Sequence, residues 1–277
     1  MSAKVISFIN MKGGVGKTTL AVNVGYTLSK HFNKKVILID VDPQMNATQY
    51  TLTAEQVKEI IENPKNTLYG ILQDKLELAP ITEKNPQQND QKYIYEISNN
   101  FDIIPSHLNI MNINLDNSPF RLLNYIKEVL KHEYDVIIID SPPTISSYTK
   151  ISLLASDMYL VPMKTDYLSL FGLPLLENYI DLLKREFSLT LDLLGITLTM
   201  VNPEFSIYTN VKKRLHQKRE WSSKIFDTEL PNKTIVAKAL SPENENSKFI
   251  YDLKGDGADL KDKIVGISQE FIQKGRI

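Results

Sequence analysis

Short apolar runs recur along the chain and predict the strands of a buried sheet. The runs are apolar almost throughout instead of alternating with polar residues, as is typical of strands that are buried on both faces of a parallel sheet. Six segments have this pattern: Lys4–Asn10, Lys35–Asp40, Phe101–Pro105, Tyr134–Asp140, Met158–Met163 and Leu194–Asn202.

Helical periodicity occupies stretches between and after these runs. One face of the segment 121–132 and one face of the C-terminal segment carry apolar residues at helical spacing. These residues are Leu122, Leu123, Ile126, Val129 and Leu130 in the first segment and Leu260, Ile264, Ile267 and Phe271 in the second. Because strands alternate with helices, we expect an α/β fold with a doubly wound, mostly parallel sheet flanked by helices.

The domain organisation predicted from the sequence is simple. No repeat or linker divides the 277 residues, and a hydrophobic content of 42% is enough for a well-filled core. We therefore expect a single domain over residues 1–277. The polar stretch TEKNPQQNDQK at residues 82–92 predicts a flexible surface insertion.

Composition excludes several classes of chemistry. The chain has no cysteine, so it forms no disulfide, thiolate metal site or iron–sulfur cluster held by cysteine. Its formal net charge is −1, so a nucleic acid would have to meet a local basic patch. No apolar run is long enough to span a membrane and no leader pattern opens the chain, which predicts a cytoplasmic protein.

A glycine-rich turn follows the first predicted strand and opens a helix. In the segment GGVGKTT, backbone N–H groups and the helix N-terminus can converge on phosphate oxygens, while Lys17 reaches the β- and γ-phosphates and Thr18 ligates Mg²⁺. Met11 stands where the strict phosphate-loop pattern has glycine. A turn that only connects strand and helix is the alternative, but the order of strand, loop, Lys-Thr and helix favours a nucleotide site.

Carboxylates follow two other predicted strands. Asp40 and Asp42 end one strand, and Asp140 ends another. A single aspartate at such a place is usually a helix cap or turn former. Because ligands of these sheets bind outside the carboxyl ends of the strands, we expect all three to point toward the glycine-rich loop. Asp140 then fits a carboxylate that holds a metal-bound water, and Asp42 fits one that orients or deprotonates the attacking water.

These motifs carry a family resemblance. The segments KGGVGKTT, DVDPQMNAT and DSPPT resemble the ParA/MinD family of deviant Walker-A ATPases, which have a P-loop NTPase fold. The segments FDIIPSHLNI, VPMKTDYLSLFGLPLL and LLGITLTMVNPEFSIYTNVKKRL are similar to the ParA/Soj partition proteins within it. The resemblance extends over nearly the whole chain and implies a weak, partner-stimulated ATPase that uses ATP and Mg²⁺.

The resemblance also implies roles for individual residues. Lys12 would be the signature lysine, which reaches the nucleotide of the other subunit in an ATP-bound homodimer, so that Lys12, Lys17 and Asp42 are the catalytic residues. Metal binding would fall to Thr18, to Asp140 through a water, and to Asp42. The nucleotide site would comprise Lys12, Gly13, Gly14, Val15, Gly16, Lys17, Thr18, Thr19, Asn202 and Pro203.

A basic segment late in the chain is a candidate DNA surface. A charge run on a helix is usually a solvated face, but the resemblance favours binding to double-stranded DNA without sequence preference. The candidate residues are Lys212, Lys213, Arg214, Lys218, Arg219, Lys224, Lys233 and Lys238. Three residues depart from the family pattern: Asp166 and Phe171 stand where glutamate is usual, and Ile235 stands where ParA proteins have a DNA-binding arginine.

The function expected from the resemblance is plasmid or chromosome partition. ATP-bound dimers would bind the nucleoid in the cytoplasm, and a ParB-type centromere-binding protein would stimulate hydrolysis and release them, with no membrane involved. One alternative is a MinD-like membrane-associated positioning ATPase with an amphipathic C-terminal helix. However, Asp262 and Glu270 interrupt the apolar stripe there, and we expect that stripe to pack on the sheet. Another is a metabolic or electron-transfer enzyme of the same fold, which the lack of cysteine disfavours.

Overall fold

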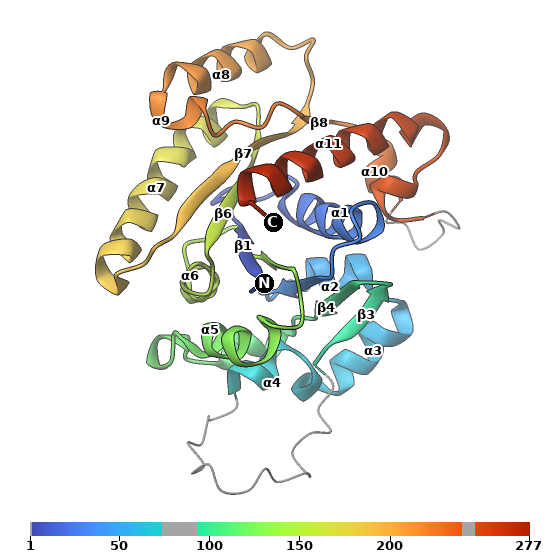
Figure 1. Cartoon of the computed structure of the whole chain (residues 1–277), viewed down its shortest axis with the longest axis vertical. Helices are drawn as coiled ribbons and strands as arrows, with labels where there is room; N and C mark the ends of the chain where they lie inside the picture. The colour runs from blue at the N-terminus through green and yellow to red at the C-terminus, as the bar shows by residue number, and fades with distance from the viewer. Residues whose placement is uncertain (1, 74–92, 240–246) are drawn as a thin grey trace, which may run out of the picture.

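The computed structural model describes residues 2–73, 93–239 and 247–277, and within them the chain forms an eight-stranded sheet (Figure 1). The predicted polar insertion at 82–92 lies outside the described residues. The strand order is β3-β4-β2-β5-β1-β6-β7-β8. The strands are β1 (Lys4–Phe8), β2 (Val36–Asp40), β3 (Tyr95–Ser98), β4 (Phe101–Ile104), β5 (Val136–Asp140), β6 (Met158–Lys164), β7 (Asp192–Val201) and β8 (Leu230–Pro231).

The sheet confirms the predicted fold class. All neighbouring strands are parallel except β3 and β4, which pair antiparallel. All six predicted strands are present. The two that the pattern missed are short edge strands, since β3 has only four residues and a partly exposed, polar sequence, and β8 has two residues, one of them proline.

Helices cover both faces of the sheet. One face packs against α1 (Lys17–Lys30), α2 (Asn46–Thr51), α3 (Ala54–Glu62) and α11 (Ala258–Gly275), with α10 (Thr234–Lys238) nearby. The other face packs against α4 (Leu68–Gln73), α5 (Arg121–Tyr125), α6 (Ser147–Leu154), α7 (Tyr167–Phe187), α8 (Ser206–Gln217) and α9 (Arg219–Ser222). Short 3-10 helices cover 64–66, 108–112, 115–117, 250–252 and 255–257.

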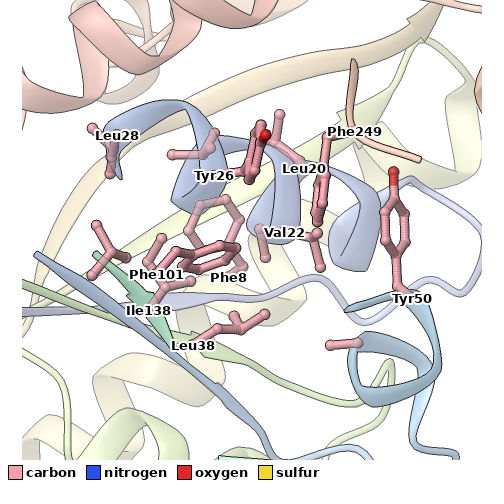
Figure 2. Packing of buried hydrophobic residues seen from close by; sticks show 14 of the residues in the cluster. Phe8, Leu20, Val22, Tyr26, Leu28, Leu38, Tyr50, Phe101, Ile138 and Phe249 are labelled. Atoms are coloured by element: carbon pink, nitrogen blue, oxygen red, sulfur yellow. The ribbon is translucent and has the colours of Figure 1, made fainter. Parts of the chain in front are cut away.

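The core beneath α1 also draws in a distant segment of the chain (Figure 2). The ring of Tyr26 on α1 stacks on Phe249, with ring centroids 3.9 Å apart. Close approach to the sheet requires a glycine on α1, because a Cβ at Gly25 would lie 2.7 Å from the Phe101 ring. This packing holds α1, and with it the loop at its N-terminus, firmly against the sheet.

The structure confirms one of the two predicted apolar helical faces in full and the other in part. In α11, Leu260, Ile264, Ile267 and Phe271 are all fully buried, as predicted. In the segment 121–132, three of the five apolar residues are buried, but Leu123 is half-buried and Val129 is exposed. The reason is a π-helical turn at Ile126–Leu130, in which the Lys131 N–H donates to the Ile126 carbonyl, because this wider turn rotates the helical face.

Candidate functional site

The glycine-rich loop lies between β1 and α1, at the carboxyl end of the central strand. Gly14 and Gly16 have φ angles of +67° and +76°, a left-handed conformation that glycine adopts without a steric penalty. Gly16 is the N-cap of α1, and no described side chain caps that helix end. Its first N–H groups are therefore available to an anion, as the phosphate-loop prediction requires.

Lys17 and Thr18 begin α1 next to the end of β5. Lys17 is 7% exposed, and the Thr18 Oγ1 donates to Asp140 Oδ2 at 2.6 Å. Asp140 is fully buried, and its Oδ1 has no hydrogen-bond partner among the described residues. A hydroxyl and a carboxylate oxygen thus meet at the loop, with one buried oxygen free to accept from a metal-bound water.

The carboxylates at this edge of the sheet make an acidic environment. Burial raises the pKa of Asp140 to about 6, although Lys17 and Thr18 oppose the shift. Burial, followed by the charge of Asp140, raises the pKa of Asp40 to about 8. A divalent cation stabilises such a group of acids, so the residues present fit Mg²⁺. In the described part of the chain, no three His, Cys, Asp or Glu side chains form a metal cluster.

Asp42 lies at the start of a tight segment between β2 and α2. It is 4% exposed, its Oδ1 accepts from the Gln44 N–H at 2.9 Å, and its Oδ2 accepts from Asn46 Nδ2 at 3.4 Å. These contacts fix the carboxylate at the edge of the sheet, beside the end of β5, because Asp40 and Asp140 are register partners. The structure therefore brings Asp42, Asp140, Lys17 and Thr18 to one place.

Asp40 differs from the prediction that all three carboxylates point toward the loop. Its Oδ2 accepts from both the N–H and the Oγ1 of Thr48, each at 2.8 Å, and its Oδ1 accepts from the Asp42 N–H at 3.1 Å. The Thr48 Oγ1 in turn accepts from the Ser106 N–H at 2.9 Å. Asp40 thus anchors the first turn of α2 and the segment that carries Asp42, which is close to the helix-cap or turn-forming role that is usual for a single aspartate at the end of a strand.

Lys12 lies apart from Lys17, on the rim of the site. Its Nζ forms an ion pair with Asp166 Oδ2 at 2.6 Å, and the two side chains are 32% and 30% exposed. The backbone at this point is held by Asn10, whose Oδ1 accepts from the Lys12 N–H and whose Nδ2 donates to the Pro162 carbonyl. The loop therefore carries one inward and one outward lysine.

The end of β7 forms another border of the loop. The Thr199 Oγ1 donates to the Val15 carbonyl at 2.6 Å, and a Cβ on Gly16 would lie 3.8 Å from Met200 Cε. Sequence reasoning did not single out Thr199 or Met200. Asn202, at the end of the same strand, accepts from the Glu204 N–H at 3.1 Å, and its contact with adenine stays a prediction, as does that of Pro203.

Comparisons with known proteins identify the family of the chain. A family model described as an AAA domain matches residues 3–193. The chain is 30% identical over 262 residues to the sporulation initiation inhibitor protein Soj of Bacillus subtilis, covering 93% of this chain and 94% of Soj. It is also 30% identical over 256 residues to the chromosome partitioning protein ParA of Myxococcus xanthus, covering 92% and 84%. The chain belongs to the ParA/Soj family of ATPases.

A solved structure supports the assignment to this ParA/Soj family. A plasmid partition protein from Borrelia burgdorferi bound to AMPPNP is 25% identical to this chain and superposes with a TM-score of 0.73. The match covers 99% of this chain and 100% of the Borrelia protein. The chain is therefore an ATPase, and ATP is its nucleotide. This agrees with the prediction made from the glycine-rich loop.

The basic residues predicted to meet DNA are not equivalent in this ParA/Soj chain. Lys212 forms an ion pair with Glu229 at 2.7 Å, and Lys233 forms one with Asp259 at 2.6 Å, so their charges are partly neutralised. Ile235, which replaces the family arginine, is half-buried. The remaining candidates form no ion pair with a described acidic residue: Lys213, Arg214, Lys218, Arg219, Lys224 and Lys238.

The C-terminal helix argues against the membrane alternative. The apolar stripe of α11 packs in the core with α1, as predicted, and is not available to a lipid surface. Among the described helices, none combines the length and apolar character needed to cross a membrane.

Proposed function

We propose that this ATPase segregates DNA through an ATP-dependent homodimer that binds double-stranded DNA. The observation that carries the proposal is the separation of the two loop lysines. Lys17 is buried at the start of α1 beside Asp140, whereas Lys12 lies on the rim and is one-third exposed. A lysine on the rim fits a cation that completes the site of a second subunit.

In this proposal, the residues of the site have separate roles in hydrolysis. The backbone of Gly13–Thr19 cradles the phosphates, Lys17 contacts the β- and γ-phosphates, and Thr18 together with Asp140, through a water, holds the metal. Bound Mg²⁺ neutralises charge on the transferring phosphoryl group. Asp42 contributes to metal binding and orients the attacking water.

Lys12 of the second subunit supplies the remaining positive charge. A cation that arrives only with the partner stabilises the transferring phosphoryl group only in the dimer, so ATP binding and dimer formation support each other. Asn202 and Pro203, at the end of β7, hold the adenine side of the nucleotide. These roles follow from the family resemblance and agree with the positions of the side chains.

DNA binding in this proposal is independent of sequence. The basic residues in and beside α8, α9 and α10 that form no ion pair with a described acidic residue would contact phosphates, and two copies in a dimer double their number. A ParB-type centromere-binding protein would stimulate hydrolysis and release the dimer from the nucleoid into the cytoplasm. The similarity to the chromosome partitioning protein ParA of Myxococcus xanthus supports this part of the proposal.

The test is ATP turnover as a function of protein concentration, with and without duplex DNA and a ParB-type protein. We expect turnover per subunit to rise with protein concentration and to rise further only when both partners are present. Lys17→Ala should abolish productive ATP binding, whereas Lys12→Ala should bind ATP but lose dimerisation. Turnover that is independent of protein concentration, or DNA binding that added salt does not weaken, would contradict the proposal.

A further inference from the structure

Asp166 joins the signature lysine to the start of α7. Its Oδ2 accepts from Lys12 Nζ at 2.6 Å, while its Oδ1 accepts from the Ser169 N–H at 2.8 Å and caps the helix. Burial raises the pKa of Asp166, but the bonds from Lys12 and Ser169 outweigh it, and the pKa lies below its usual value. The carboxylate is therefore ionised near neutral pH, and both of its oxygens are engaged.

The ion pair and a contact with a second subunit compete for the same ammonium group. The Lys12 backbone is tied to Asn10, and Asn10 is tied to β6 through the Pro162 carbonyl. Only the flexible side chain is free to move, and at 32% exposure it can swing outward without disturbing the loop. A lysine that reaches the phosphates of a partner must first leave Asp166.

We propose that Asp166 is a positioning residue that holds Lys12 within its own subunit and opposes its delivery to the nucleotide of a second subunit. The inference rests on the dimer in the proposed function. The several negative charges of a bound nucleotide attract the ammonium more strongly than one partly exposed carboxylate, so ATP in the partner releases Lys12. Asp166 thereby raises the protein concentration at which dimers form.

The size of the effect follows from exposure and symmetry. An ion pair this exposed shifts an equilibrium by roughly two- to fivefold. Each dimer breaks two such pairs, one per subunit, so the dimer dissociation constant should change by roughly 4- to 25-fold.

Asp166→Asn isolates the ion pair from the helix cap. Asparagine caps helices about as well as aspartate, so the bond to Ser169 is kept and only the charge is lost. A matched control is Asp116→Asn, because Asp116 pairs with Lys150 at 3.0 Å and does not contact the loop. Thermal unfolding of the three proteins checks that α7 is intact.

The primary measurement is the dimer dissociation constant by analytical ultracentrifugation with Mg²⁺ and a nonhydrolysable ATP analogue. We expect Asp166→Asn to lower this constant by roughly 4- to 25-fold and Asp116→Asn to leave it unchanged. Turnover per subunit at saturating protein should change little, since Lys12 is already in the partner there.

The experiment distinguishes failure of this inference from failure of the proposed function. If the wild-type protein dimerises with the analogue but Asp166→Asn dimerises equally or less tightly, the inference is wrong and the proposed function stands. If the wild-type protein stays monomeric at all concentrations, the proposed function itself fails.

Discussion

Thr48 is the residue through which Asp40 holds the segment that carries Asp42. Its hydroxyl donates to Asp40 Oδ2 at 2.8 Å and accepts from the Ser106 N–H at 2.9 Å, and all three residues are fully buried. Thr48→Val replaces the hydroxyl with a methyl group of similar size. The substitution therefore removes two hydrogen bonds while leaving the shape of the core almost unchanged.

The expected loss of stability is the sum of two contributions. A hydrogen bond to Asp40 contributes about 1–3 kcal/mol, depending on the charge of this carboxyl group, whose pKa is raised by burial. The Ser106 N–H loses its acceptor inside the core, which costs about 1–3 kcal/mol. The free energy of unfolding should fall by roughly 2–6 kcal/mol, which lowers Tm by roughly 4–10 °C in a chain of this size.

The assay is thermal and urea unfolding of the nucleotide-free protein, followed by circular dichroism. Thr51→Val is the matched control, since Thr51 lies on the same helix, is 5% exposed and donates its hydroxyl only to helix backbone carbonyls among the described residues, Ala47 at 2.8 Å and Thr48 at 3.3 Å. We expect the control to lose less than about 1 kcal/mol. The reasoning is refuted if Thr48→Val loses no more stability than Thr51→Val.

Three further predictions concern packing, hydrolysis and DNA. Gly25→Ala should lower the free energy of unfolding by about 1–2 kcal/mol, because the new Cβ would overlap a ring of the core. Gly172→Ala should raise it by about 0.5–1 kcal/mol, because a Cβ there would meet no described atom within 4 Å beyond the adjacent residues and the backbone of its own helix, and alanine favours the helix. Urea unfolding measures both variants, and equal effects would contradict the packing argument. Asp42→Ala should keep ATP binding but slow hydrolysis by about 10²- to 10⁴-fold in a phosphate-release assay, and loss of ATP binding would disprove its assignment to the water. Lys213→Ala should reduce the slope of log binding constant against log salt concentration by about one for each binding site on DNA, as measured by fluorescence anisotropy. Lys233→Ala should reduce this slope by less, because Lys233 is ion-paired with Asp259, and the reverse order would count against the proposed DNA surface.

Much of the fold could be predicted because its signals are local. Continuous apolar runs marked the six strands other than β3 and β8, and helical spacing marked the buried face of α11. The prediction failed where a tertiary or backbone feature overrode the local pattern. Val129 is exposed because a π-helical turn rotates the helix, and β8 was missed because two residues carry no periodicity.

The sequence by itself determined the phosphate loop and the family. Glycines at positions that need positive φ, a lysine and threonine at the helix start, and aspartates at strand ends are read from neighbouring residues, and they identify the chemistry. The family resemblance alone assigns different roles to the two lysines of the loop, and these roles stay predictions.

Only the tertiary structure decided which side chains pair across the chain. Lys12 meets Asp166 across 154 positions because β1 and β6 are parallel neighbours whose carboxyl ends lie together. Asp40 turns to Thr48, and Lys212 and Lys233 are partly neutralised by Glu229 and Asp259, for the same kind of reason. Such contacts depend on strand order and helix placement, which the packing of the whole sheet sets and no short stretch of sequence encodes.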